Sequence, residues 1–333
     1  MDQIPQGDVL VLDGAAPGGV PAGSVAHRLL ANGLNINALR TNDVLRKEEW
    51  LLFDRTVLDV ARPMLIGVGD LMSRNLRVPI TNAMGITAVQ YETVSDMGPA
   101  ETNMSGVADS QRDRVVFSQV NVPLPITHKD FHLSLRNLES GRRLGTPLDT
   151  TMAATAARRV ADALESMLFN GVAITAGGGT IYGYLNHPNR NTGSTTASWA
   201  TATGEQILAD VQAMIAKAVT DNMFGPYILY VSTDSFVHML GDFKAASDKS
   251  IIQRVLEVPQ IAAVRPTTQI TPADVVLLVQ MTSDVVDWLD GLQPTTVMWE
   301  THGGMMINFK VMSIGAPRIK ADADTRSGVV HYS

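Results

Sequence analysis

The clearest periodic pattern in the chain runs from Pro147 to Phe169, where apolar residues recur at helical spacing. Thr146 and Asp149 have the spacing of a helix cap and its partner acid, and Pro147 suits the first helical position. Gly171 suits the left-handed residue that ends a helix. The pattern predicts one long helix over 147–169, about 35 Å in length. Its apolar positions are Met152, Ala156, Val160, Ala163, Leu164, Met167 and Leu168.

Two segments of strand-type composition, Ile86–Val94 and Arg114–Val122, enclose a stretch of small and polar residues from Asp96 to Asp113. Two strands joined by so long a tip predict a projecting β-hairpin rather than a compact turn. Because an isolated hairpin is only marginally stable in water, we expect this one to rest on another chain.

The remaining patterns predict a mixed α+β chain. Thr41–Asn75 shows helical spacing, with capping residues at 41–43 and a second helix starting at Pro63. The other predicted helices are 205–220, 234–240 and 248–256, and the other predicted strands are 227–232, 275–280, 295–300 and 305–313. No internal repeat of the length found in solenoids is evident.

The start of the chain has a different composition. Nine of its first 35 residues are Gly or Pro, and 13–23 contains six of the nine. Such a segment loses much conformational entropy on ordering and has few large apolar side chains. We expect an extended arm that lies on neighbouring subunits, and a flexible tail stays open as the alternative.

Composition excludes several classes of protein. The chain has 26 Lys and Arg against 33 Asp and Glu, a net charge of -7, with 18% charged and 45% hydrophobic residues. This is too apolar for a disordered chain, while no apolar run reaches the length of a membrane span. The absence of cysteine excludes disulfides, thiol catalysis and cysteine metal sites. The acidic balance argues against a surface built mainly to hold nucleic acid, and Met1–Asp8 has no secretory-signal pattern.

Two glycine-rich segments resemble nucleotide-binding loops only in part. No Lys-Ser or Lys-Thr follows Gly177-Gly178-Gly179 at P-loop spacing, and Gly67-Val68-Gly69 lacks the third glycine of a dinucleotide fingerprint. We therefore interpret both as structural, a turn and a helix glycine.

Three groups of polar residues have spacings that could form a binding site. His128 and His132 lack the glutamate and third ligand of a zinc site, and we interpret them as surface or interface residues. Asp284, Asp287 and Asp290 are expected along one side of a helical turn, as an acidic face without calcium-loop spacing. Arg136, Arg142 and Arg143 are a local basic group without interleaved aromatics. The prediction is no catalytic, cofactor or metal site, and no enzyme.

The order of these elements and several sequence blocks carry a resemblance. The blocks are Val122 to Pro125, Phe131 to Gly141, Pro147 to Gly171, Tyr182 to Pro188 and Phe224 to Tyr227. In them the chain resembles encapsulins and the related major capsid proteins of tailed bacteriophages, which share the Hong Kong 97-type capsid fold. None of the blocks is a catalytic signature.

The resemblance implies a division of the chain into the parts of that fold. Residues 1–40 would be the N-terminal arm, 41–85 the N-terminal helices, and 86–122 the extended loop across an adjacent subunit. Residues 123–194 and 291–333 would form the peripheral domain, with 147–169 as its spine helix. Residues 195–290 would form the axial domain.

The resemblance also implies a function, a major capsid protein that self-assembles into hexamers and pentamers of an icosahedral shell around a phage genome. Expected partners are further copies of the chain, a portal, a scaffold, a decorating protein and non-specifically contacted double-stranded DNA, with no membrane and no cofactor. The expected location is the virion, assembled in the bacterial host cytoplasm. The Gly/Pro-rich arm and long hairpin tip favour this over an encapsulin nanocompartment, because encapsulins are generally shorter and start with a cargo-binding helix. A soluble enzyme with an unrecognised site is the remaining alternative.

Overall fold

The fold is built on two β-sheets that share an apolar core, in a computed structural model that describes residues 47–95, 102, 104, 114–144, 150–244, 248–271, 274–322 and 324–333. The predicted arm over 1–40, the capping residues at 41–43 and most of the hairpin tip lie outside these residues. Within the described ranges, no helix combines the length and apolar character needed to cross a membrane.

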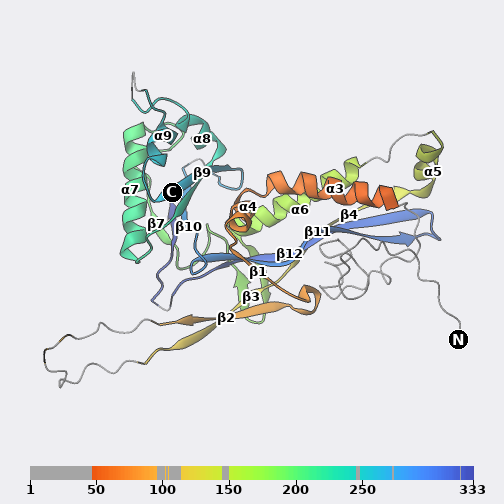
Figure 1. Cartoon of the computed structure of the whole chain (residues 1–333), viewed down its shortest axis with the longest axis horizontal. Coiled ribbons are helices and arrows are strands. Elements are labelled where there is room, and N and C mark those ends of the chain that lie inside the picture. Colours follow the sequence, from red (N-terminus) through yellow and green to blue (C-terminus); the bar gives the residue numbers. More distant parts are fainter. Residues whose placement is uncertain are drawn as a thin grey trace.

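The first sheet has four strands in the order β1-β11-β12-β4, with β1 parallel to β11 and the other pairs antiparallel. Helices α3 and α6 lie together along this sheet (Figure 1). The rings of Phe53 on α3, Phe131 on β4 and Phe309 on β12 pack against one another, with Phe131 and Phe309 stacked at 5.0 Å. The element bounds are β1 Arg77–Pro79, β4 Ile126–Ser134, β11 Val286–Thr301, β12 Met306–Ile319, α3 Lys47–Met64 and α6 Thr151–Asn170.

The second sheet has five strands in the order β7-β13-β10-β8-β9. Alternate residues of β8 face two cores, because successive strand residues point to opposite sides. Tyr227, Leu229 and Val231 pack in a core with α7, whereas Ile228 and Tyr230 join the core of the first sheet. The element bounds are β7 Asn191–Gly193, β8 Tyr227–Ser232, β9 Ile261–Thr267, β10 Val276–Gln280, β13 Val329–Tyr332, α7 Gly204–Thr220, α8 Thr233–Met239 and α9 Ile251–Leu256.

Local sequence explains where α7 begins. Thr203 accepts a hydrogen bond from the Gln206 backbone N–H, and the Gln206 side chain accepts one from the Thr203 N–H. This reciprocal capping box satisfies two backbone donors that a helix start leaves without partners. The helix predicted over 205–220 is confirmed, as are the strands over 227–232 and 275–280.

The predicted hairpin is confirmed as β2 (Ala88–Val94) paired antiparallel with β3 (Phe117–Pro123). Figure 1 shows it running out from the body, apart from both large sheets. A short hairpin of β5 (Val172–Ala176) and β6 (Gly179–Ile181) packs on its base, where the Asn121 amide donates a hydrogen bond to the Gly177 carbonyl at 2.5 Å.

Two predicted helix starts are wrong. Thr150 lies outside α6, so the long helix begins at Thr151 rather than at Pro147, and residues 145–149 lie outside the described part of the chain. Pro63 lies in the last turn of α3 instead of starting a helix, and the next helix is α4 (Ile66–Ser73). The predicted end of the long helix is close, since α6 ends at Asn170 and Gly171 follows with φ of 69°.

Candidate assembly interface

The base of the β2–β3 hairpin is fixed to the first sheet by Tyr91. Its hydroxyl donates a hydrogen bond to the Ile319 carbonyl at 3.4 Å, and the Arg318 guanidinium lies 5.3 Å from its ring centre. Burial raises the pKa of the Tyr91 hydroxyl, which therefore stays protonated and able to donate. Arg318 in turn pairs with Asp287, whose side chain is only 3% exposed and also contacts Lys320 at 2.8 Å. A buried ionic group therefore lies beneath the contact that joins the hairpin to the first sheet.

The outer part of the same hairpin exposes apolar side chains. Val94 and Phe117 are directly opposite each other in the register, so their side chains lie on one face of the hairpin. Phe117 is 62% exposed, Val94 46% and the adjoining Val116 59%. A two-stranded ribbon that presents large apolar groups to solvent is typical of a surface that another molecule covers.

A second set of exposed apolar residues lies on the five-stranded sheet's helices. Val237 on α8, Leu240 directly after it and Leu256 at the end of α9 are all exposed. Phe224, in the turn between α7 and β8, is also exposed. The hairpin and the helical end of the second sheet therefore both offer surfaces suited to contacts with other subunits.

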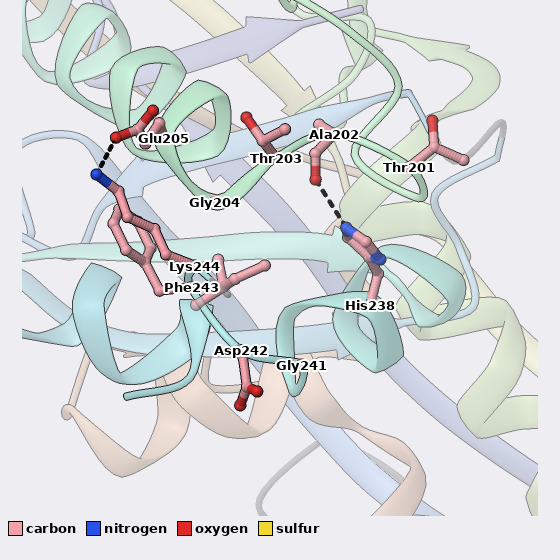
Figure 2. Close-up of a pocket in the computed structure, with 11 residues that line it drawn as sticks. Thr201, Ala202, Thr203, Gly204, Glu205, His238, Gly241, Asp242, Phe243 and Lys244 are labelled. Carbon is pink, nitrogen blue, oxygen red and sulfur yellow. Dashed lines mark hydrogen bonds and ion pairs between the residues drawn. The ribbon is translucent and has the colours of Figure 1, made fainter. Parts of the chain in front are cut away.

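A pocket of about 720 Å³ lies where α7 begins and where the chain passes from α8 to α9. Figure 2 shows two contacts between residues that line it: Glu205 forms an ion pair with Lys244, and the His238 Nε2 lies 2.7 Å from the Ala202 carbonyl oxygen. Phe243 packs so closely on Gly204 that an added Cβ would lie 2.6 Å from its ring. Glu205, Lys244 and His238 thus contact one another or the backbone, an arrangement typical of a structural junction.

The glycines and histidines considered above as binding residues lie in a turn, in a helix and on an exposed strand. Gly177 and Gly178, with φ of 60° and 79°, form the turn between β5 and β6, as predicted. Gly67 is a helix glycine of α4, as predicted, in close contact with α6. His128 and His132 are both exposed on β4, about 13 Å apart along the strand.

The predicted acidic helical face is wrong. Asp287 and Asp290 belong to strand β11, and Asp284 lies exposed in the turn before it. Asp287 is buried with Arg318 and Lys320, while Asp290 faces Arg77 of β1 at 3.6 Å. Within the described ranges, no three His, Asp or Glu side chains are placed to hold a metal ion.

The basic group lies on α5 (Leu135–Leu144). Arg136 and Arg143 are exposed there, and the side chain of Arg142 lies outside the described part. Sequence reasoning missed two buried groups, the ionic contacts beneath Tyr91 and the carboxylate of Glu165 on α6. For Glu165 a signal exists, because it lies at helical spacing from Ala161 and Leu168, on the apolar face of the helix.

The fold matches solved structures of a virus-like particle and of a phage capsid. A virus-like particle from Pyrococcus furiosus matches at a TM-score of 0.61 and 16% identity, covering 86% of this chain and all of that one. The capsid of Myoviridae phage XM1 matches at 0.58 and 10% identity, covering 74% of this chain and 85% of that one. The Mycobacterium phage Adephagia structure matches at a TM-score of 0.58 and 9% identity, covering 79% of this chain and 89% of that one. The α+β chain thus has the Hong Kong 97-type capsid fold that the sequence predicted.

Sequence similarity points to the same group. The chain is 31% identical over 192 residues to the type 1 encapsulin shell protein EncA of Myxococcus xanthus, which covers 56% of this chain. The match spans 61% of the length of EncA. The model of the DUF6260 family, described as a family of unknown function, matches residues 37–332. The chain belongs to the DUF6260 family and has a capsid fold related to that of encapsulins.

Proposed function

We propose that this chain is the subunit of a closed icosahedral shell, in which the β2–β3 hairpin contacts the neighbouring subunit. The observation that carries the proposal is the contrast between the two ends of the hairpin. Tyr91 holds the base on the first sheet, while Val94 and Phe117 are exposed at the outer end. A closed symmetric assembly would cover this surface on every subunit.

The cargo that we propose is a phage genome, which makes the chain a major capsid protein that forms hexamers and pentamers. In support, the solved capsid of phage XM1 is among the structures with this fold. The Gly/Pro-rich start of the chain and the long stretch between the hairpin strands also favour this function. A portal, a scaffold, a decorating protein and non-specifically bound double-stranded DNA would be its partners, and the virion its location. The role is structural and needs no catalysis.

Within such a shell we assign the parts as the resemblance implies. Residues 86–122 act as the extended loop, and α6 is the spine of the peripheral domain formed by 123–194 and 291–333. Residues 195–290 form the axial domain, residues 1–40 form the arm, and 41–85 contribute the N-terminal helices. Three strands cross these bounds: β7 and β13 lie in the peripheral ranges but belong to the five-stranded sheet with β8, β9 and β10, and β11 begins at Val286 although it belongs to the first sheet. The exposed residues Val237 and Leu256 then contact adjacent axial domains.

An encapsulin-type nanocompartment is the second candidate. The 31% identity to EncA favours it, because this is a similarity of sequence and not of fold alone. The two candidates differ in what the shell encloses. Particles purified from the native source, treated with nuclease and then opened, should release long double-stranded DNA if the chain is a phage capsid. A co-purified protein at fixed ratio, without DNA, would favour the encapsulin function.

The hairpin contact can be tested with two matched variants. Phe117→Asp removes the exposed aromatic and adds a charge, whereas Gln119→Asp adds the same charge to an exposed neighbour on the same strand. We expect Phe117→Asp to keep the far-ultraviolet circular dichroism of the wild type but to remain unassembled in sedimentation velocity. Gln119→Asp should still form particles. Assembly of both variants at wild-type yield would contradict the proposed contact.

A further inference from the structure

Glu165 is a carboxylate buried inside the subunit at the junction of its two sheets. Its side chain accepts hydrogen bonds from the backbone N–H groups of Gly67, at 2.6 Å, and Val68, at 3.3 Å, in the first turn of α4. The residue is 3% exposed. Among the described residues, no Lys, Arg or His lies within ion-pair distance of it. A carboxylate held by backbone donors alone is costly to keep ionised in an apolar interior.

The groups around Glu165 do not supply the missing positive charge. Asp70, one turn along α4, adds a second negative charge, and Arg265 of β9 pairs with Asp70 at 3.2 Å. The titratable side chains of Tyr184 and Tyr230 complete the surroundings, with Tyr230 donating to Asp70 at 3.2 Å. The hydroxyl of Tyr184 is fully buried without a hydrogen-bond partner among the described residues. Helix α3 and strands β4 and β12 meet α6 through the apolar core.

Helix α4 links the two halves of the subunit through these contacts. Glu165 joins its first turn to α6, and Asp70 joins it to Tyr230 of β8 and Arg265 of β9. The fit is tight, because a Cβ added at Gly67 would lie 2.8 Å from the Leu168 side chain and 3.1 Å from the Glu165 oxygen. Any change in the charge of Glu165 therefore acts directly on the element that connects the long helix with the five-stranded sheet.

We propose that Glu165 is a proton-controlled latch, which holds α4 firmly between α6 and the five-stranded sheet when neutral and loosens that junction when ionised. In a shell of the proposed kind, the latch would make each subunit more rigid in mildly acidic than in alkaline solution. That consequence rests on the proposed function, whereas the latch itself is a property of the single subunit.

The direction of the effect follows from proton linkage. Burial raises the pKa of Glu165 to about 7 against an ordinary value of 4.5, an effect larger than the opposing one of the Gly67 and Val68 hydrogen bonds. The folded chain therefore binds this proton more tightly than the unfolded chain does. The resulting stabilisation is fully present below pH 4.5 and is lost as the pH rises through 7.

The first test compares unfolding temperature against pH, from 5 to 8.5, for dissociated full-length subunits of three chains. Glu165→Gln imitates the neutral acid, and Asp162→Asn is the matched control, on the exposed side of the same helix. The wild type and Asp162→Asn should follow the same curve, which combines the contribution of Glu165 with the opposing pH dependence of His187. The unfolding temperature of Glu165→Gln should rise relative to both of them between pH 6 and pH 8, because only this variant lacks the titrating carboxyl group. Parallel curves for all three chains would overturn the proposal.

A second measurement needs no variant and covers the case in which Glu165→Gln fails to fold. Hydrogen–deuterium exchange of the peptide that contains α4 is followed in the wild type at pH 5 and pH 8, corrected for the intrinsic exchange rate. Protection should fall by roughly 10- to 100-fold at pH 8, since one linked proton changes the opening constant by up to tenfold per pH unit. Equal protection at both pH values would overturn the latch. Because the subunits are unassembled, either result leaves the shell function to be tested separately.

Discussion

Arg318 donates two hydrogen bonds to Asp287, from Nε to Oδ1 at 2.8 Å and from Nη2 to Oδ2 at 2.5 Å. The two residues face each other across β11 and β12, directly below the ring of Tyr91 at the hairpin base. The paired planar geometry fixes the guanidinium, and the guanidinium positions the ring. The ion pair therefore connects the stability of the first sheet to the placement of the hairpin.

Replacing Asp287 with Ala should destabilise the subunit by about 3–5 kcal/mol, because it leaves two largely buried cations, Arg318 and Lys320, without their anion. Urea unfolding of dissociated full-length subunits measures this. Asp59→Ala is the control, since Asp59 forms an exposed pair with Arg55 and should cost no more than about 1 kcal/mol. Equal unfolding midpoints for the two variants would show that the buried ionic group does not support the fold.

Leu168→Asp should prevent the subunit from folding to a soluble form. Leu168 is fully buried on α6 against α4, where a carboxylate would find no compensating partner and would cost several kcal/mol, roughly the cost of a buried charge. The soluble fraction after expression is the measurement. Met152→Asp, on the same helix but half-exposed, should stay soluble. A normal yield of soluble Leu168→Asp would contradict the assignment of α6 as the central buried helix.

His187 should make the subunit sensitive to acid. Burial, followed by the nearby Arg190 charge, lowers the pKa of His187 to about 4 from 6.5. Its Nδ1 accepts a hydrogen bond from the Asn189 N–H at 3.3 Å, which a charged imidazole could not do. The unfolded chain binds this proton more tightly, so stability is present above pH 6.5 and is lost as the pH falls toward 4.

His187→Asn keeps an acceptor at that position but cannot titrate. The difference in unfolding free energy between this variant and the wild type should shift in favour of the variant by up to about 3 kcal/mol between pH 7 and pH 4. His302→Asn, in the exposed turn between β11 and β12, is the matched control. If both variants follow the wild-type curve, His187 does not cause the acid sensitivity.

The assembled particles should be free of covalent links between subunits. In some shells of the capsid family that this chain resembles, neighbouring subunits are joined by an isopeptide bond from a lysine of the extended loop. Here residues 86–122 contain no lysine, the nearest being Lys47 and Lys129, and the chain has no cysteine. Arg112 and Arg114 are poor nucleophiles because the guanidinium stays protonated. A denaturing gel of boiled particles should show one band near 35.8 kDa, and a ladder of larger species would refute this.

Much of this architecture follows from local sequence. The capping pair Thr203 and Gln206 marks the start of α7, and the β-branched composition of β2 and β3 reveals the hairpin. These features were predictable because the determining residues lie within a few positions of one another. The same holds for β8 and β10, whose continuous apolar runs are typical of strands buried on both faces.

The wrong and missing predictions concern residues whose partners lie far away in the chain. The acidic residues Asp287 and Asp290 suggested a solvated helical face, since charged side chains rarely lie inside a strand. Their partners Arg318 and Arg77 lie 31 and 213 positions away in the chain, and only the folded sheet brings them together. Glu165 was missed for a related reason, because its partners are backbone groups of a separate helix, α4. Such long-range pairing is not encoded in local spacing.

The most direct test of the shell function is the size of what the full-length chain forms when it is expressed alone and purified. Sedimentation velocity, with negative-stain electron microscopy of the same fractions, gives that size and shape. Closed, uniform particles many times larger than the 35.8 kDa subunit are the expected result. A chain that remains monomeric or forms only small oligomers, both when expressed alone and when purified from its native source, would contradict the account.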